Sequence, residues 1–251
     1  MPLRVTVVGS SSAYSRQPGR ASSCYLVESG EDAIVLDLGQ GAFSALAGFR
    51  DPATVRAYLI SHLHPDHWID LVPLRHYLRF GEASRRTAEL YAPADIRRRA
   101  DAVAGEVDFL GNLEGGPLEP GRRMIGKLTV EARRVRHTDS SFAFRVSEGA
   151  DTAPGLVYSG DCGRADDLVP LIQPGDTLLA EASFGAGEAI PGVEHLTSGE
   201  AARAATEGGA KRLVITHVLD GVDRSEALRA AAERFEGETI LAEPGLTLES
   251  E

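Results

Sequence analysis

The sequence predicts an α+β protein in which two β-sheets pack against each other between outer helices. Short apolar runs typical of buried strands alternate with segments whose apolar residues recur at helical spacing. Each half of the chain has a strand that ends in Asp near Gly and a later strand that ends in a hydroxyl residue followed by His. Two sheets between helices bury every apolar face. Because no linker of distinct composition separates the halves, we expect residues 1–251 to form a single domain built from two similar βα halves.

In the first half, a polar loop at residues 10–20 allows two interpretations. It is either a solvated turn or one wall of a pocket that presents Tyr14, serine hydroxyls and two arginines to a substrate. Residues 111–126 are rich in Gly and Pro and are predicted to form a mobile surface loop. We expect strands at residues 3–8, 23–27, 33–38, 55–60 and 88–91, and helices at 42–47, from Asp66 to residue 78, and from Pro93 onward.

In the second half, β character returns at residue 128 and helices follow later in the chain. A loop at residues 186–195 precedes the second of these helices. The strands are expected at residues 128–136, 141–147, 156–159, 177–181, 212–216 and 239–242, and the helices near 166–172 and at 198–207 and 224–235.

Composition limits the classes of function. A net charge of −11 and a pI near 5.2 argue against a protein coated with basic surface for nucleic acid, although bound metal ions would still create a local positive site. The N-terminus leads directly into a strand, so we expect no signal peptide, and no apolar run is long enough to span a membrane. We therefore predict a cytoplasmic protein in which Cys24 and Cys162 are free thiols.

The most informative stretch follows the apolar run at residues 55–60 and has the pattern His-x-His-x-Asp-His. Its candidate ligands are His62, His64, Asp66 and His67. Imidazole and carboxylate groups suit a borderline divalent metal such as Zn²⁺, and Mn²⁺ or Fe is possible on the same ligands. Four ligands this close in sequence do not all reach one ion comfortably. The spacing therefore indicates two adjacent metal ions.

Three more candidate ligands lie at predicted strand ends: His137, Asp161 and His217. Strand ends at one edge of a sandwich converge, so these side chains are expected to join the histidine string. His76 lies within a predicted helix and is interpreted as structural rather than as a ligand. The arginine run at residues 97–99 is interpreted as a solvated helix face.

Together these residues resemble the metallo-β-lactamase superfamily over nearly the full chain. The resemblance implies a four-layer αββα sandwich with a dinuclear site between its halves. It implies that one metal is held by His62, His64 and His137, that a second is held by Asp66, His67 and His217, and that Asp161 bridges both.

Within this superfamily the chain is most similar to the ribonuclease Z and phosphodiesterase branch. The similarity rests on His195-Leu196-Thr197-Ser198, the helix after it and Thr216-His217. It implies that His195 contacts the scissile phosphate of a small phosphodiester or RNA substrate. A helix-capping segment without a catalytic role is the alternative interpretation of His195. The resemblance also makes a homodimer a reasonable assembly.

The expected chemistry follows from two cations about 3.5–4 Å apart, which lower the pKa of a bridging water that attacks phosphorus in line. Asp66 is expected to orient this nucleophile, and His195 to stabilise developing charge. We expect Glu194 to fix the tautomer of His195. Asp37 is a candidate partner of the metal ligands, with a purely structural role equally open, and Cys162 is interpreted as a packing residue.

The chain departs from tRNA-processing ribonuclease Z enzymes in one place. Those enzymes carry a long Gly/Pro-rich arm between the positions that correspond to His137 and Asp161, whereas this chain has only a predicted strand and a turn there. With the acidic net charge, this makes a small phosphodiester at least as plausible a substrate as tRNA. The alternatives are hydrolysis of a carbon-centred substrate (a lactone, thioester or β-lactam) and a metal-binding scaffold without turnover.

Overall fold

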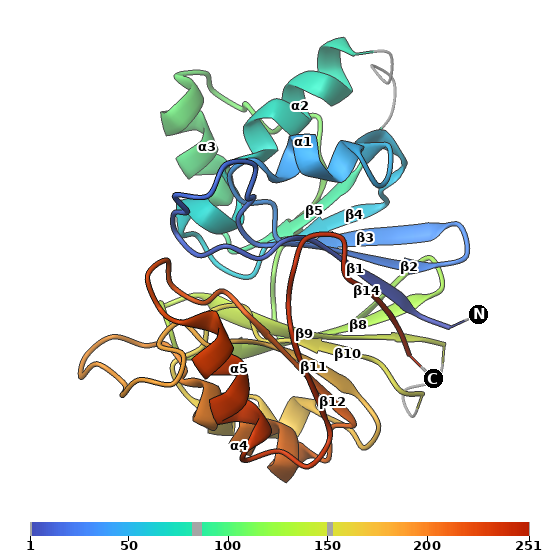
Figure 1. The fold of residues 1–251 in the computed structure, drawn as a ribbon. Coiled ribbons are helices and arrows are strands. Elements are labelled where there is room, and N and C mark those ends of the chain that lie inside the picture. The colour runs from blue at the N-terminus through green and yellow to red at the C-terminus, as the bar shows by residue number, and fades with distance from the viewer. Residues whose placement is uncertain (1, 82–86, 150–152, 251) are drawn as a thin grey trace.

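The computed structural model describes residues 2–81, 87–149 and 153–250. Two seven-stranded sheets lie face to face, with helices on both outer faces (Figure 1). The predicted α+β, four-layer αββα arrangement is confirmed. No helix within the described ranges is long and apolar enough to cross a membrane.

The first sheet has the strand order β14-β1-β2-β3-β4-β5-β6. Its strands from β3 to β6 are parallel, whereas β1 pairs antiparallel with both β2 and β14. The strands are β1 (Arg4–Gly9), β2 (Cys24–Ser29), β3 (Asp32–Leu36), β4 (Ala57–Leu59), β5 (Glu89–Ala92), β6 (Glu114–Pro117) and β14 (Thr247–Glu249).

The second sheet has the order β13-β12-β11-β10-β9-β8-β7. The strands from β10 to β13 are parallel, and those from β7 to β10 are antiparallel. The strands are β7 (Gly121–Ile125), β8 (Leu128–Val135), β9 (Ser141–Glu148), β10 (Leu156–Tyr158), β11 (Thr177–Glu181), β12 (Arg212–Thr216) and β13 (Glu238–Leu241).

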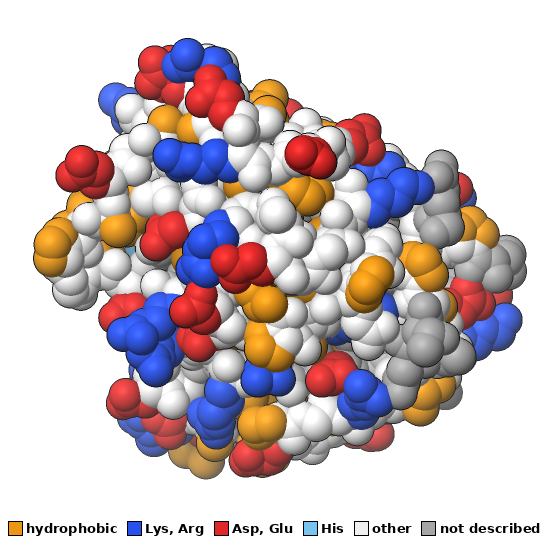
Figure 2. Space-filling view, turned by 90° about the horizontal axis from the view of Figure 1, so that it is seen from below, with side chains coloured by type: hydrophobic (Ala, Val, Ile, Leu, Met, Phe, Trp, Pro, Cys, Tyr) orange, Lys and Arg blue, Asp and Glu red, His pale blue; other side chains and the backbone are white. Residues whose placement is uncertain are grey.

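The helices form the two outer layers (Figure 1). Helices α1 (Ala42–Ala47), α2 (Leu71–Phe80) and α3 (Ile96–Ala104) cover the first sheet, and α4 (Ser198–Gly208) and α5 (Arg224–Ala232) cover the second. Helix α4 begins at a capping box in which Thr197 and Glu200 satisfy each other's backbone N–H groups. On the side of α4 and α5, acidic and basic side chains are interspersed (Figure 2).

Three apolar layers hold this arrangement together. The central one joins the facing sides of the sheets and includes Val7, Leu36, Phe144 and Val214. The other two lie between each sheet and its helices. Most side chains on both faces of the central strands are buried, which explains why those strands are almost continuously apolar in sequence.

Several sequence predictions of local structure were wrong. Residues 111–126 are not simply a loop, because they contain β6 and β7, the edge strands of the two sheets. The helix expected near 166–172 is instead two 3₁₀ turns, Ala165–Asp167 and Val169–Leu171, because Pro170 cannot donate the hydrogen bond that an α-helix needs there. Strand β14 was not predicted.

Two helix starts also differ from the prediction. Asp66 and His67 do not begin α2 but lie in a separate 3₁₀ turn, Pro65–His67. Pro93 lies in a turn in which its carbonyl accepts from the N–H of Ile96, where α3 begins. In both places a proline begins a tight turn, and the helix begins only after that turn.

The parallel strands bring their carboxyl ends to one edge of the sandwich. Asp37 follows β3, His62 follows β4, Asp161 follows β10 and His217 follows β12. His137 follows β8, which runs in the same direction as β10 because both are antiparallel to β9. Polar side chains from both sheets therefore meet at this edge, where α/β folds commonly bind ligands.

Candidate metal centre

The first group of predicted ligands comprises His62, His64, His137 and Asp161, whose ligand atoms lie within 4.8 Å of one another. Nε2 of His137 lies 3.0 Å from Nδ1 of His64. Oδ2 of Asp161 lies 3.6 Å from Nε2 of His62 and 3.7 Å from Nε2 of His137. His62 and Asp161 are buried and His64 is exposed, so this group opens to solvent on one side.

The second group comprises Asp66, His67 and His217, all buried. Nε2 of His217 lies 3.2 Å from Oδ2 of Asp66 and 3.3 Å from Nε2 of His67. The 3₁₀ turn Pro65–His67 directs Asp66 and His67 to this position, and His217 reaches it from the other sheet.

Asp161 lies between the two groups. Its Oδ2 faces the first group, whereas its Oδ1 lies 3.4 Å from Nε2 of His67 and 3.6 Å from Nδ1 of His217. The structure thus brings all the predicted ligand side chains together at one edge of the sandwich. Asp161 also forms a third group with His195 and His217, whose ligand atoms lie within 4.8 Å of one another.

The donor set fits divalent metal ions. Nε2 of His62 and Oδ1 of Asp161 are buried atoms without a hydrogen-bond partner among the described residues. In addition, imidazole nitrogens face one another in the pairs His64–His137 and His67–His217. Converging nitrogen and carboxylate lone pairs without partners are the arrangement that a cation satisfies, and histidine with aspartate suits zinc.

The environment favours the ligand forms of two of these groups. Burial lowers the pKa of His62 well below its usual range and so keeps the imidazole neutral. Burial alone would raise the pKa of Asp66, but the hydrogen bonds with His217 and His67 outweigh it, and the pKa is lowered. Neutral imidazole and ionised carboxylate are the forms that bind metal.

Asp37 fixes the candidate ligand His67 through the ring nitrogen that faces away from the cluster. Its Oδ2 accepts from Nδ1 of His67 at 2.7 Å and from the Tyr158 hydroxyl at 2.6 Å. Its carboxylate also accepts from the backbone N–H and the hydroxyl of Ser61. Asp37 is fully buried, and its φ of 60° turns the chain sharply after β3. The hydrogen bond from Nδ1 leaves Nε2 of His67 to face the cluster.

The predicted role of Glu194 in fixing His195 was wrong. Nδ1 of His195 instead lies 2.8 Å from Oε1 of Glu181, a buried carboxylate at the end of β11. Glu194 is exposed, and its backbone carbonyl accepts from Nδ1 of His137 at 2.6 Å. Sequence reasoning missed Glu181. A glutamate at the end of an apolar strand, the next strand in the chain after Asp161, was a usable signal.

Glu181 also determines the charge of His195. Burial opposes protonation of the imidazole, but the hydrogen bond and charge of Glu181 outweigh it and raise the pKa of His195 to about 9. Nε2 of His195 has no partner among the described residues. Nδ1 lies 3.9 Å from Oδ2 of Asp161, which places His195 beside the ligand cluster.

The remaining predictions concern residues around the site. Cys162 is buried in the core beneath α4, in agreement with a packing role. His76 is remote from the ligand cluster and packs against Phe80 and Phe109. The solvated interpretation of residues 97–99 agrees with the exposure of Arg98 and Arg99, whereas Arg97 is half-buried. Arg97 donates to the carbonyls of Leu110 and Leu113, and Arg99 donates to that of Leu63.

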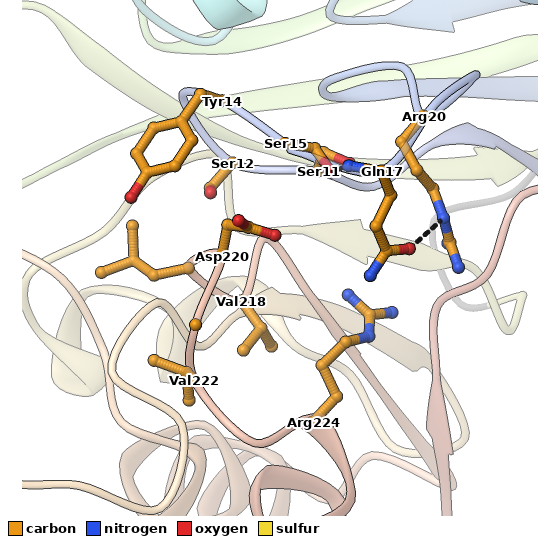
Figure 3. A pocket seen from close by; sticks show the side chains of 12 residues that line it. Ser11, Ser12, Tyr14, Ser15, Gln17, Arg20, Val218, Asp220, Val222 and Arg224 are labelled. Carbon is orange, nitrogen blue, oxygen red and sulfur yellow. Dashed lines mark hydrogen bonds between the residues drawn. The ribbon is translucent and has the colours of Figure 1, made fainter.

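Two cavities flank the ligand cluster. One, of about 270 Å³, is lined by His64 together with Leu63, Pro93, Arg99 and Thr138. The other, which we call the side pocket, has a volume of about 70 Å³ and lies between residues 11–20 and residues 218–224 (Figure 3). The loop at residues 10–20 is therefore a pocket wall rather than only a solvated turn.

Comparisons with known proteins agree with this geometry. Residues 31–218 match the family described as the Beta-lactamase superfamily domain. The uncharacterized protein Rv1339 of Mycobacterium tuberculosis is 33% identical over 245 residues, which cover 94% of this chain and 88% of that protein. Ribonuclease Z of Halobacterium salinarum is 26% identical over 304 residues, covering 99% of this chain and 98% of that protein.

The probable metallo-hydrolase YhfI of Bacillus subtilis is similar in both sequence and structure. It is 28% identical over 254 residues, covering 98% of this chain and all of YhfI. The crystal structure of YhfI, a metallo-beta-lactamase fold protein, superposes with a TM-score of 0.88 at 26% sequence identity, covering 99% of this chain and 100% of that chain. This chain therefore has the metallo-β-lactamase fold and belongs to the β-lactamase superfamily of metallo-hydrolases.

Proposed function

We propose that the protein is a phosphodiesterase that uses two divalent metal ions, zinc in the first place, with ligands from both sheets. His62, His64 and His137 would hold one ion, Asp66, His67 and His217 would hold the other, and Asp161 would contact both. The observation that carries the proposal is the position of His195. Its imidazole lies beside the bridging carboxylate, and Glu181 keeps it in place.

Two ions bound there would supply Lewis acidity, lowering the pKa of water and offsetting negative charge on a phosphoryl group. The chain's own residues supply the remaining functions. Asp66, which is ionised and buried between His67 and His217, orients the attacking water by accepting a hydrogen bond from it. His195 has its Nδ1 occupied by Glu181, so its Nε2–H is free to donate to the phosphoryl or leaving-group oxygen.

The N–H donor at Nε2 of His195 favours phosphorus over carbon as the reaction centre. A phosphodiester carries a negative charge before reaction and gains more during it, so a fixed hydrogen-bond donor stabilises it more than it stabilises a neutral lactone or thioester. The similarity to a ribonuclease Z along the full chain supports the same choice. We therefore rank hydrolysis of a lactone, thioester or β-lactam second.

We further propose a small phosphodiester, rather than a 3′-extended tRNA, as the substrate. The chain between His137 and Asp161 consists of β9, a connection and β10, which leaves no arm to hold a folded RNA. The net charge of −11 also opposes association with a large polyanion.

The test is hydrolysis of bis(p-nitrophenyl) phosphate by protein supplied separately with Zn²⁺, Mn²⁺ and Fe²⁺. We expect activity with at least one metal, and a loss of about 100-fold or more in kcat for His195→Ala, within the range found for general acids and charge-stabilising donors. His76→Ala, a histidine outside the cluster, serves as the matched control. An unchanged rate for His195→Ala would remove the catalytic role of His195. Faster turnover of simple lactones than of the phosphodiester would favour the second candidate.

A further inference from the structure

We propose that Ser61 and Ser183 are positioning residues of the metal centre, and that each serine serves one of the two ions. In the first half of the chain the hydroxyl of Ser61 links a buried carboxylate to His62, a candidate ligand of the first group. In the second half the hydroxyl of Ser183 links another buried carboxylate to His217, a candidate ligand of the second group. We call these two arrangements the serine links. The inference rests on the two-ion centre of the proposed function.

The first serine link joins Asp37, Ser61 and His62, which are all fully buried. Oγ of Ser61 lies 2.7 Å from Oδ2 of Asp37 and 3.1 Å from Nδ1 of His62. A hydroxyl has one proton to donate, and a carboxylate oxygen only accepts. The proton of Ser61 therefore points to Asp37, and the hydroxyl oxygen accepts from Nδ1–H of His62. The backbone N–H of Ser61 donates to Oδ1 of Asp37 at 2.6 Å, which holds the serine against the carboxylate.

The second serine link joins Glu181, Ser183 and His217 at the same distances. Oγ of Ser183 lies 2.7 Å from Oε2 of Glu181 and 3.1 Å from Nδ1 of His217. The carbonyl oxygen of His217 and Nδ1 of His195 are farther from this hydroxyl, both at 3.2 Å. Glu181 is thus the nearest acceptor for the proton of Ser183, and the hydroxyl oxygen accepts from Nδ1–H of His217.

The chain assembles these two links by different routes. Ser61 directly precedes its histidine in sequence and reaches across to Asp37, which follows the neighbouring strand β3. Ser183 instead follows its carboxylate by two residues and reaches across to His217, which follows the neighbouring strand β12. The same three groups at the same two distances are therefore not a by-product of one repeated backbone segment. This indicates that the contact serves the ligands.

The serine links determine which ring nitrogen faces the metal centre. A neutral imidazole that donates through Nδ1–H presents the lone pair of Nε2, which is the form that binds a metal ion. Nε2 of His62 has no hydrogen-bond partner among the described residues and lies 3.6 Å from Oδ2 of Asp161. Nε2 of His217 lies 3.2 Å from Oδ2 of Asp66. Without the hydroxyl, nothing in the link holds the proton on Nδ1, and a ring with its proton on Nε2 does not bind there.

Each serine affects one group of ligands because the carboxylates have contacts of their own. When the hydroxyl of Ser61 is removed, Asp37 keeps its 2.7 Å contact with Nδ1 of His67 in the second group. When the hydroxyl of Ser183 is removed, Glu181 keeps its 2.8 Å contact with Nδ1 of His195. The loss of either hydroxyl should therefore be felt by one ion.

The experiment measures the dissociation constants of both Zn²⁺ ions, by competition with a chromophoric chelator, in the wild type, Ser61→Ala and Ser183→Ala. Two further variants, His64→Ala and Asp66→Ala, each lack a ligand of one group only and show which constant belongs to which ion. We expect Ser61→Ala to raise the Kd of the first ion about tenfold and Ser183→Ala to raise that of the second about tenfold, as for other partners of metal-binding histidines. The other constant in each variant should change less than about threefold.

The matched control is Ser147→Ala, which removes another buried hydroxyl, at the end of β9 away from His137. Both of its constants should equal those of the wild type. A serine that only supports the fold would lower Tm and leave the two constants unchanged or raise them equally, and either result overturns the proposal. A selective loss in one serine variant alone overturns the link through the other serine.

Failure of the proposed function can be recognised separately. If the wild type binds two ions but does not hydrolyse bis(p-nitrophenyl) phosphate, phosphodiesterase activity is wrong, and the affinities still test the serine links. If the wild type binds fewer than two ions, or a serine variant does not fold, long-range ¹H–¹⁵N NMR spectra of the metal-free wild type test them instead. Protons on Nδ1 of His62 and His217 support the serine links, whereas a proton on Nε2 of either ring overturns the link to that histidine.

Discussion

Nδ1 of His195 lies 2.8 Å from Oε1 of Glu181, the last residue of β11. Glu181 is fully buried and also accepts from Ser183 and from the backbone N–H of Cys162, so its carboxylate is fixed on several sides. In the parallel pairing of β11 with β12 it stands opposite Thr216, the residue before His217. The sheet register thus places Glu181, the partner of His195, beside the end of the strand that leads to the candidate ligand His217.

We predict that Glu181→Gln lowers kcat for bis(p-nitrophenyl) phosphate about 10–100-fold, the range typical for partners that orient functional histidines. The effect on KM should be smaller, because the substrate still meets the metal centre. Steady-state kinetics separate the two parameters, and a thermal melt of the variant shows that it is folded. Glu194→Gln is the control and should behave as the wild type. Equal losses in both variants would contradict the positioning role of Glu181.

Asp37→Asn should weaken metal binding about 10–100-fold, because the amide no longer accepts reliably from Nδ1 of His67. The measurement is the metal content that remains after dialysis against a graded series of chelator concentrations. Tyr158→Phe removes a different hydrogen bond from the same carboxylate and leaves the contact with His67, so it should lose less metal. If both variants retain metal like the wild type, Asp37 has only a structural role.

Removal of metal should lower the thermal stability. A ligand present at 100 times its Kd stabilises the native state by about 2.7 kcal/mol, which corresponds to about 5–10 °C in Tm for a chain of this size. We therefore expect EDTA to lower Tm by this amount and added Zn²⁺ to restore it. In Asp161→Ala, which lacks the carboxylate between the two groups, the shift should be clearly smaller. A Tm that does not respond to EDTA in the wild type would argue against a resident metal.

Asp32 joins the two sheets away from the site. Its carboxylate, at the start of β3, accepts from the backbone N–H of Lys127 at 2.8 Å, in the turn between β7 and β8, and pairs with Arg56. Although burial alone would raise the pKa of Asp32, these hydrogen bonds and charges lower it. A lowered native pKa means that ionised Asp32 stabilises the fold above its unfolded pKa of about 4, and that this stabilisation is lost as pH falls through the native value.

We predict that Asp32→Asn destabilises the protein by about 1–3 kcal/mol at pH 7, the usual cost of removing one partner of buried polar groups. The difference from the wild type should shrink as pH falls below about 4, where the wild type loses its ionised carboxylate. Urea unfolding at pH 7 and pH 3 provides the comparison. Asp95→Asn, which alters an exposed helix-end pair, should change stability little at either pH. A difference that is equal at both pH values would contradict the linkage.

Much of the fold could be predicted because its signals are local. The strand Thr177–Glu181 and the helix Ala42–Ala47 have the predicted bounds, since apolar runs and helical spacing are properties of neighbouring residues. The edge strands β6, β7 and β14 could not be predicted in this way. They are short and largely polar or glycine-rich, and they are strands only because a neighbouring sheet edge supplies their hydrogen bonds.

The sequence alone identified the candidate ligands, because four of them lie within six residues and the others directly follow apolar strands. Only the tertiary structure decided which group holds His195, since Glu181 lies 14 residues from it and the nearer Glu194 points to solvent. It also decided that Ser12 faces a cavity and that Arg99 holds the carbonyl of Leu63. Such contacts depend on how the two sheets and their loops pack, and this packing cannot be predicted from a local pattern of residue types.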